Sequence, residues 1–532
     1  MLRICLVRLF SGSIVIIVIA LASSRAAVGK ADSNAKSGIR YFISNSGDPN
    51  NSGTSPSSPW PISKVNQVTF LPGDAICLHK GEVFSGTLTP LGSGIPAAPI
   101  TIGSYGRGAR PVIQASSADE AAVRLTDQEY WEIDGLEITG SNRFGIYFAA
   151  VSDDKVLHHL YVSNCVVHDV TTTDTPRYDS GLIVVAPTGQ RATFVNVLID
   201  NVTASNTNQW YGIHVGFNFN YGFIDGDPRS SNITVRNCTV HDVGGDLIAV
   251  ASSQRVLLSN NLAYNGGLAP EGTVTNQYTP NAIWSWASDR VTVQYNEVYQ
   301  MHSYAYDGGA FDADWNSSNV TIQYNYAHDN DGFCAAVYGF QGFTTTNTVV
   351  RYNICTNNDL KSGYSPGEIY LLCDSSSGID GLQIYNNSIY SVSADDRGAI
   401  NAAGISFTGS LPNLIKNNVL YSTKPTMVQV AKGVEMGNNI YWLVGSGTPT
   451  WIYDGISYST PQETESQVVD PGLNDPTYHA NGRPTVSFTA PANSPVLEAG
   501  ELLPNMGRYD FFGNLLPTSG DPSSGAYEGS PA

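Results

Sequence analysis

Short runs of alternating apolar and polar residues fill the middle of this chain, and the i, i+3, i+4 spacing of amphipathic helices is nearly absent. One phrase recurs: an apolar run, then asparagine, any residue, an apolar residue and tyrosine or histidine, then a turn. It begins at Asn261, Asn296, Asn325, Asn387, Asn418 and Asn438, and more loosely at Asn353. Cys165 and Cys238 occupy the asparagine position in two earlier copies.

The spacing of this phrase predicts a coiled β structure. Most copies lie about 20–36 residues apart, which is the length of one turn of a parallel β-helix with loops of variable length at its corners. Asparagines stacked at one corner can hydrogen-bond through their amides along the stack, which satisfies polar groups that the turn would otherwise bury.

A second strand is expected after each phrase. Its first inward residue is taken as Leu182, Ile213, Leu247, Ile283, Phe311, Cys334, Ile369 and Ile400. Side chains alternate between the two faces of a strand, so the next position faces outward. That position holds Ile183, His214, Ile248, Trp284, Asp312, Ala335, Tyr370 and Asn401. The neighbouring outward positions add Asp246, Glu368, Trp286 and Asp314.

Two carboxyl groups on one rigid face suit acid/base chemistry on a sugar. Asp312 and Asp314 are two residues apart, so their Cα atoms lie roughly 6.5–7 Å apart on a strand. Retaining and inverting glycosidases both use a carboxyl pair. Mutual repulsion and the flanking tryptophans would raise the pKa of one of the two, making it the acid. Asp307 is expected to be a corner residue in a turn.

The candidate catalytic residues are therefore Asp312, Asp314, Asp246 and Glu368. The candidate substrate-binding residues are His214, Trp284, Trp286, Tyr370, Asn401 and Arg397. His168, His241 and His328 share a repeat position with several tyrosines, which indicates packing beside the asparagine stack.

Three parts of the sequence resemble secreted right-handed parallel β-helix proteins of the pectin-lyase-like superfamily, of carbohydrate-active type. They are the opening with Pro99–Tyr105, the coil repeat, and the closing run with Asp510–Gly513 and Gly525–Glu528. The resemblance implies an all-β, right-handed parallel β-helix (a β-solenoid) with an N-terminal cap and a C-terminal closing segment. The superfamily includes polysaccharide lyases, glycoside hydrolases, epimerases and phage tailspikes, so fold does not settle chemistry.

The chain divides into four expected segments. They are a signal peptide (1–30), an N-terminal cap with the first coils (38–115), the β-helix (116–450) and the closing segment (451–532). Arg3 and Arg8 precede an apolar run from Ser13 to Ala22, followed by small residues, as in a secretory signal. The run is shorter than the ~20 residues of a spanning helix, although an uncleaved anchor is the alternative. We predict a secreted protein, extracellular or periplasmic.

The charge narrows the possible partners. A formal net charge of -19 disfavours nucleic acid and anionic membranes, which need cationic surfaces. It would also repel a polyanionic polysaccharide, unless calcium or a local basic patch intervened. Beyond Cys5, the cysteines are Cys77, Cys165, Cys238, Cys334, Cys355 and Cys373; with no CxxC pair among them, we expect buried free thiols.

Three functions fit these features. The first is hydrolysis of a polysaccharide or oligosaccharide without a cofactor. The second is a calcium-dependent polysaccharide lyase acting on a uronate polymer. In this case Asp312 and Asp314 would hold the calcium, and Arg177, Arg290 or Arg397 would reach the substrate. The resemblance implies a Lys or Arg base for a lyase, but no lysine lies between Lys155 and Lys361. The third is a non-catalytic carbohydrate-binding protein, in which the two aspartates bind calcium or cap a turn.

Overall fold

A computed structural model describes residues 38–173, 178–218, 224–269, 279–364, 366–405, 407, 409 and 411–529. The expected signal peptide and Arg177 lie outside these residues. Strands dominate the described part of the chain, and its one helix is the short α1 (Ile62–Val65). No helix in the described ranges is long and apolar enough to cross a membrane.

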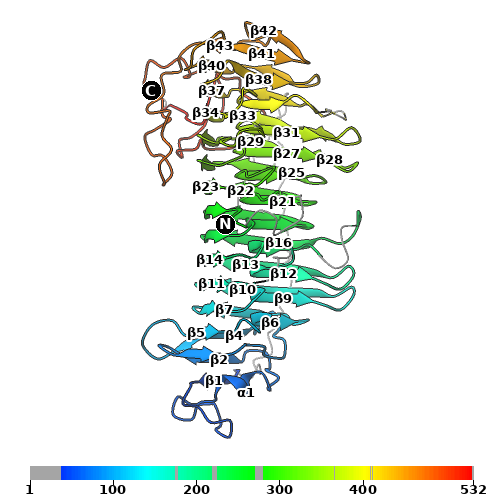
Figure 1. The fold of residues 1–532 in the computed structure, drawn as a ribbon, viewed down its shortest axis with the longest axis vertical. Helices are drawn as coiled ribbons and strands as arrows, with labels where there is room; N and C mark the ends of the chain where they lie inside the picture. The colour runs from blue at the N-terminus through cyan, green and yellow to red at the C-terminus, as the bar shows by residue number, and fades with distance from the viewer. Residues whose placement is uncertain are drawn as a thin grey trace, which may run out of the picture. The chain divides into compact units, whose positions relative to one another are not determined.

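Nearly all strands belong to three sheets of 16, 14 and 13 strands (Figure 1). The first runs from β1 (Arg40–Ile43) to β39 (Glu435–Gly437), and the second from β3 (Val83–Ser85) to β43 (Gln467–Val468). The third runs from β6 (Ala121–Thr126) to β42 (Ile456–Tyr458). Strand numbers rise in steps of about three along each sheet, because each coil gives one strand to each sheet. The predicted all-β parallel β-helix is confirmed.

The third sheet contains the predicted site. Its central strands are β12 (Gly181–Pro187), β15 (Tyr211–Val215), β18 (Asp246–Ala251), β21 (Ile283–Trp286), β24 (Phe311–Ala313), β27 (Ala335–Gly339), β31 (Ile369–Cys373) and β35 (Ile400–Ala402). One continuous hydrophobic core, formed mainly by aliphatic side chains, fills the space between the three sheets. Each strand pairs in parallel with its equivalent in the next coil.

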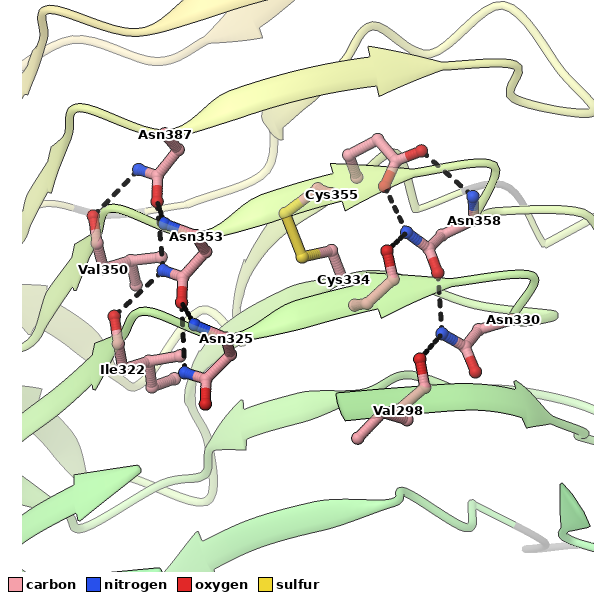
Figure 2. Close-up of a disulfide and its surroundings, with 12 residues drawn as sticks. Val298, Ile322, Asn325, Asn330, Cys334, Val350, Asn353, Cys355, Asn358 and Asn387 are labelled. Atoms are coloured by element: carbon pink, nitrogen blue, oxygen red, sulfur yellow. Dashed lines mark hydrogen bonds between the residues drawn. A yellow bond between two sulfur atoms is a disulfide. The ribbon is translucent and has the colours of Figure 1, made fainter. Parts of the chain in front are cut away.

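The asparagine stack forms a continuous ladder. Asn353 Nδ2 donates to Ile322 O and Asn387 Oδ1, both at 3.0 Å, and its Oδ1 accepts from the backbone N and Nδ2 of Asn325, also at 3.0 Å (Figure 2). The same pattern links Asn261, Asn296, Asn325, Asn353, Asn387, Asn418 and Asn439. Cys238 continues the stack through its backbone N–H, which donates to Asn261 Oδ1 at 3.0 Å.

The last member of the ladder is Asn439, whereas the phrase predicted Asn438. Leu420 pairs with Tyr441, which shifts the final copy of the phrase by one residue. The histidines at the repeat position pack as predicted. His241, Tyr264, Tyr299 and His328 form one column of stacked rings with centroids 4.7, 4.8 and 5.0 Å apart.

Cys334 and Cys355 form a disulfide, so the prediction of free thiols is wrong for these two residues (Figure 2). Cys334 lies just before β27, and Cys355 lies in β30 (Ile354–Thr356) of the second sheet. Their Cα atoms are 5.6 Å apart, within disulfide range. The two meet because successive coils place different sheets around one core, a proximity that sequence spacing does not reveal. Cys77, Cys165 and Cys238 are buried thiols, as expected.

The C-terminal segment packs along the flank of the second sheet. Phe488, Val496 and Phe511 share a buried cluster with Tyr326 and Val419. His479 also lies 3.1 Å from Asp329, near the middle of the helix. Figure 1 shows this segment beside β34 and β37 (Ser388–Ser391 and Val419–Ser422). Strands also continue past residue 450, through β41 (Thr450–Tyr453) to β43.

The ladder predicts a large effect for Asn353→Ala. Two buried N–H donors of Asn325 would lose their acceptor, and the carbonyl of Ile322 would lose a donor. Unsatisfied buried groups cost about 1–3 kcal/mol each, so we expect a loss of roughly 2–4 kcal/mol in the free energy of unfolding. Chemical denaturation would measure this loss. The exposed Asn493→Ala serves as a control, and equal stability of the two variants would contradict the ladder's role.

Candidate active site

The register of the third sheet aligns the predicted outward residues. Ile213, Ile248, Ile283, Phe311, Ala335, Ile369 and Ile400 pair in one inward column. The next column consists of Val184, His214, Ala249, Trp284, Asp312, Ala336, Tyr370 and Asn401. Ala249 and Trp284 form a cluster separate from the main core, so this column faces outward. The structure confirms that five predicted side chains face outward: His214, Trp284, Asp312, Tyr370 and Asn401.

Three outward predictions are wrong, since Ile183, Ile248 and Ala335 face the core. The reason is that two successive residues point inward around the start of each of these strands. Leu182 and Leu247 at the first of these positions also belong to the core. Cys334 occupies the same position in its coil and reaches across the core to Cys355.

Glu368 lies at this inward position, so its outward prediction is also wrong. Its side chain is fully buried. Its carboxyl oxygens accept from the backbone N of Asn358 at 3.1 Å and from Asn358 Nδ2 at 2.7 Å. Asn358 in turn accepts from Asn330 Nδ2 at 2.6 Å, which makes a second, shorter ladder (Figure 2). Burial raises the pKa of Glu368 to about 8. These contacts give Glu368 a structural part at the end of that ladder.

Asp246 and Asp312 are joined by Asn281, a residue that sequence reasoning missed. The backbone N of Asn281 donates to Asp246 Oδ1 at 2.7 Å, and its Nδ2 donates to Asp312 Oδ2 at 3.2 Å. Trp210 Nε1 donates to Asp246 Oδ2 at 2.7 Å. Both carboxyls are only 1% exposed. Asp312 Oδ1 is buried and accepts no hydrogen bond from the residues that the structure describes.

Asp307 and Asp314 are the partly exposed members of this acidic cluster. Asp307 precedes β24 in a loop, and its Oδ1 accepts from the hydroxyls of Tyr338 at 2.8 Å and Tyr364 at 3.3 Å. Asp314 follows β24 directly, and its Oδ1 accepts from the backbone N of Trp315 at 2.8 Å. Asp307 therefore belongs to the site rather than to a plain turn. Only its position five residues before Asp312 hinted at this.

All four carboxyls have raised pKa values, and burial is the largest cause for each. Burial raises the pKa of Asp307 to about 6 and that of Asp246 and Asp314 to about 8. Asp312 has its pKa raised well above the ordinary value, by burial first and then by the charges of Asp314, Asp307 and Asp246. Because adjacent carboxylates cannot all ionise in a buried site, the cluster retains protons at neutral pH.

A cleft of about 550 Å³ adjoins the cluster. Its walls are Tyr178, Asp179, Tyr211, His214, Phe217, Ala251, Trp284 and Trp286. Trp284 pairs with Asp312 in the register, so the cleft ends beside the carboxyls. Burial lowers the pKa of His214 to about 3, and its imidazole is therefore neutral at pH 7. An aromatic cleft ending at protonated carboxyls suits a substrate with both apolar faces and hydroxyl groups.

The remaining predicted residues lie on the other side of the cluster. The ring of Tyr370 lies 5.9 Å from Tyr338 and 6.3 Å from Tyr364. Asn401 follows Tyr370 in the outward column. Burial and the charge of Asp307 raise the pKa of Tyr370. Arg397 is exposed, and its positive charge acts on this pKa in the opposite direction. Arg290 lies on the first sheet, paired with Asp289 at 2.9 Å, away from this face.

No group of three or more His, Cys, Asp or Glu side chains in the described part of the chain is arranged to hold a metal ion. Calcium binding by Asp312 and Asp314 stays a prediction.

Comparison with known proteins supports the fold. Residues 116–367 match a family described as "Right handed beta helix region". No curated protein sequence matches the chain. The native structure of the GH136 lacto-N-biosidase from Eubacterium ramulus is 20% identical, with a TM-score of 0.52 over 81% of this chain and 68% of that chain. Pectate lyase Pel9A is 15% identical, with a TM-score of 0.41 over 93% of this chain and 97% of that one. The chain is thus a right-handed parallel β-helix protein, as predicted.

The raised pKa of Asp314 predicts that its carboxyl destabilises the fold as pH rises. The folded pKa of about 8 lies above the ordinary value near 4, so the stabilising protonation is complete only below about pH 4 and is lost through pH 8. Asp314→Asn removes this loss. We expect its melting temperature to exceed that of the wild type by about 2 °C or more at pH 9, and by less at pH 5.

Circular dichroism melts at pH 5, 7 and 9 would measure this difference. The control is Asp374→Asn, because hydrogen bonds from Ser377 and Ser376 lower the pKa of Asp374 to about 2. That variant should lower the melting temperature equally at all three pH values. A pH-independent difference for Asp314→Asn would contradict the protonated cluster.

Proposed function

We propose that this protein is a secreted glycoside hydrolase that cleaves a polysaccharide or oligosaccharide at the acidic cluster. One observation carries the proposal: two partly exposed carboxyls, Asp307 and Asp314, lie on either side of Asp312 in the chain, and Asp312 pairs with Trp284 of the aromatic cleft. The GH136 lacto-N-biosidase of the same fold is compatible with this chemistry. Secretion rests on the N-terminal sequence pattern.

The pKa values divide the two carboxyls into an acid and a base. Glycoside hydrolysis needs one protonated and one ionised carboxyl at the scissile bond. Asp307, with a pKa of about 6, is mostly ionised at pH 7, whereas Asp314, with a pKa of about 8, is mostly protonated. Asp314 then donates its proton to the leaving oxygen, and Asp307 acts as nucleophile or as base toward water. The hydroxyls of Tyr338 and Tyr364 orient Asp307 for this step.

The two buried carboxyls act through their neighbours. Burial and the charge of Asp307 raise the pKa of Asp314, so that Asp314 keeps its proton. The pKa of Asp312 is itself raised, by burial and by the charges of Asp314, Asp307 and Asp246. Asp246 reaches Asp312 only through Asn281 and therefore positions the group. The proposed catalytic pair is therefore Asp314, which is one of the four candidates from the sequence, and Asp307, which lies in the loop before β24.

In the described part of the chain, no Lys or Arg charge acts on the four carboxyls, which is compatible with hydrolysis. Elimination on a uronate needs a positive group to neutralise the sugar carboxylate. Among the described residues, Arg290 lies on another sheet, and Arg397 is exposed beyond Tyr370. The following experiment distinguishes hydrolysis from the two alternatives, a lyase and a non-catalytic binding protein.

Asp307→Asn and Asp314→Asn should each lower kcat about 10²–10⁴-fold, because each removes a group that moves a proton or attacks the sugar. Reducing-end release from a panel of plant and microbial glycans, with mass spectrometry of the products, would measure this. Asp289→Asn, on the first sheet, should keep full activity. Products with an unsaturated, ultraviolet-absorbing end would identify a lyase instead, and full activity in both cluster variants would refute the site.

Trp284→Ala and Trp286→Ala should raise KM roughly tenfold with a smaller change in kcat, because both indoles line the cleft and would stack on sugar rings. Steady-state kinetics on the substrate found above would separate the two constants. Trp442→Phe is the control, because Trp442 packs near the C-terminal segment. An unchanged KM in both cleft variants would place the substrate elsewhere.

A further inference from the structure

A loop of the closing segment lies on the outer face of the second sheet. Two backbone hydrogen bonds close its neck, from Asn474 N to Thr489 O at 2.9 Å and from Phe488 N to Asn474 O at 2.7 Å. Residues 475–487 between them are called the docking loop below. Phe488 at the neck is fully buried in the hydrophobic cluster of the closing segment. The tip of the loop can therefore open while its neck stays attached.

Two carboxylates of the second sheet hold the tip of the docking loop. The backbone N of Gly482 donates to Glu297 Oε1 at 2.6 Å. His479 Nδ1 lies 3.1 Å from Asp329 Oδ1. Glu297 is the first residue of β23 (Glu297–Met301), which pairs with the strand that Asp329 follows. The tip therefore depends on acidic side chains from two adjacent coils.

His328, the last residue of β26 (Tyr326–His328), lies between these two carboxylates. Its Nδ1 is 2.7 Å from Asp329 Oδ2, and its Nε2 is 3.5 Å from Glu297 Oε1. A protonated imidazole has an N–H for each carboxylate. A neutral imidazole has only one N–H, so one of the two carboxylates then loses its cationic partner.

The docking loop covers this group of charges. The Tyr326 hydroxyl donates to Ala480 O in the loop at 3.2 Å, and the Tyr326 ring stacks on His328 at 4.5 Å. His328 is fully buried as a result. In a covered site the carboxylates cannot exchange a lost cationic partner for water, so the cost of leaving them unpaired is large.

A matching histidine in an earlier coil shows what the loop adds. His168 Nδ1 is 2.7 Å from Asp169 Oδ2, and its Nε2 is 3.2 Å from Glu137 Oε1. His168 lies five strands earlier in the same sheet. Its side chain is 23% exposed, whereas that of His328 is 0% exposed. Water can screen the charges around His168, so the same arrangement of side chains is strongly coupled to its surroundings only under the docking loop.

Other titratable groups also surround His328. On the sheet they are Tyr299, whose ring stacks on the imidazole at 5.0 Å, and Tyr326. On the loop side Tyr478 stacks on Tyr326, and Arg483 acts on Glu297 through its charge. Burial lowers the pKa of Arg483 to about 10. Arg483 is therefore cationic from pH 5 to pH 9, and it contributes no change of charge in that range.

The pKa of His328 gives the direction of the pH effect. Burial alone would lower this pKa, but the contacts with Asp329 and Glu297 outweigh burial and raise it. His328 therefore stabilises the closed loop fully below its ordinary pKa near 6.5, and this stabilisation is lost as pH rises through the raised pKa. Burial opposes the lowered pKa of Asp329, which hydrogen bonds from His328 and Asn357 cause. The contribution of Asp329 is thus complete above about pH 4.

We propose that the docking loop is a pH-sensitive latch, closed over His328 in mildly acidic medium and opening as the medium becomes alkaline. Opening admits water to Glu297 and Asp329 once His328 is neutral. It also uncovers Tyr326 and His328, which extends the column of stacked rings that the loop leaves uncovered at His241. The latch lies on the second sheet, away from the acidic cluster, so it does not depend on the proposed function.

Hydrogen–deuterium exchange of the full chain, read by mass spectrometry at pH 5.5 and 8.5, tests the latch. After correction for the intrinsic exchange rates, peptides from residues 475–487 report how often the loop opens. We expect the opening constant to rise at least about threefold from pH 5.5 to pH 8.5. Peptides from the first sheet should show no such rise.

Three variants show which group carries the effect. His328→Gln cannot gain a proton, so its loop should open at pH 5.5 as often as the wild-type loop does at pH 8.5. Glu297→Gln still accepts from Gly482 but has no charge to compensate, so its pH dependence should also shrink. His479→Gln should keep most of the pH dependence, because His479 is 55% exposed. Circular dichroism checks that each variant is folded.

His168→Gln is the matched control, because it removes a histidine with the same two kinds of partner outside the docking loop. Its loop should open as in the wild type at both pH values. A wild-type loop that opens equally at both pH values, or more at pH 5.5, would overturn the proposal. So would a folded His328→Gln variant with the full wild-type pH dependence.

Discussion

The asparagine ladder is the interaction on which the rest of the structure depends. Each coil contacts mainly its neighbours, so the bonds between adjacent coils, in the paired strands and in the ladder, fix how one coil sits on the next. The amide of each ladder asparagine bonds both to the next asparagine and to a backbone carbonyl, which leaves one register that satisfies all the buried groups. A slip of one residue would turn every side chain of a strand to the opposite face. The ladder therefore determines that Asp312 faces outward beside Trp284.

The sequence predicted what is periodic and missed what is not. The ladder, the stacked tyrosines and histidines, and most of the outward column follow from residue types that recur in every coil. The two-residue alternation breaks around the start of strands in the third sheet, because two consecutive side chains turn inward there. Glu368 and Ala335 were both predicted to face outward, and both predictions are wrong for this reason. Asp307 and Asn281 precede their strands, where no repeat indicates a direction.

The acidic cluster illustrates why a rigid scaffold suits this site. Burying four carboxyls opposes folding, since desolvation disfavours each charge and the charges repel one another. A flexible loop would relax and let them separate. Here Asp246 and Asp312 are tied to strands through Asn281, and the long ladders on the other side of the core supply the stability that the cluster removes. The shifted pKa values are thus a product of the scaffold's stiffness.

The carboxyls near the site that have the greatest access to solvent all lie just outside strands. Asp307 comes four residues before β24, Asp314 directly follows it, and Asp179 comes two residues before β12. Residues within the strands, such as Asp312 and His214, are almost fully buried by their neighbours in the column. A repeating strand can therefore supply aromatic rings such as those of Trp284 and Trp286 and shift a pKa, whereas the carboxyls proposed to react with a substrate lie at the strand ends. In such a protein the repeat locates the site, and the departures from the repeat define its chemistry.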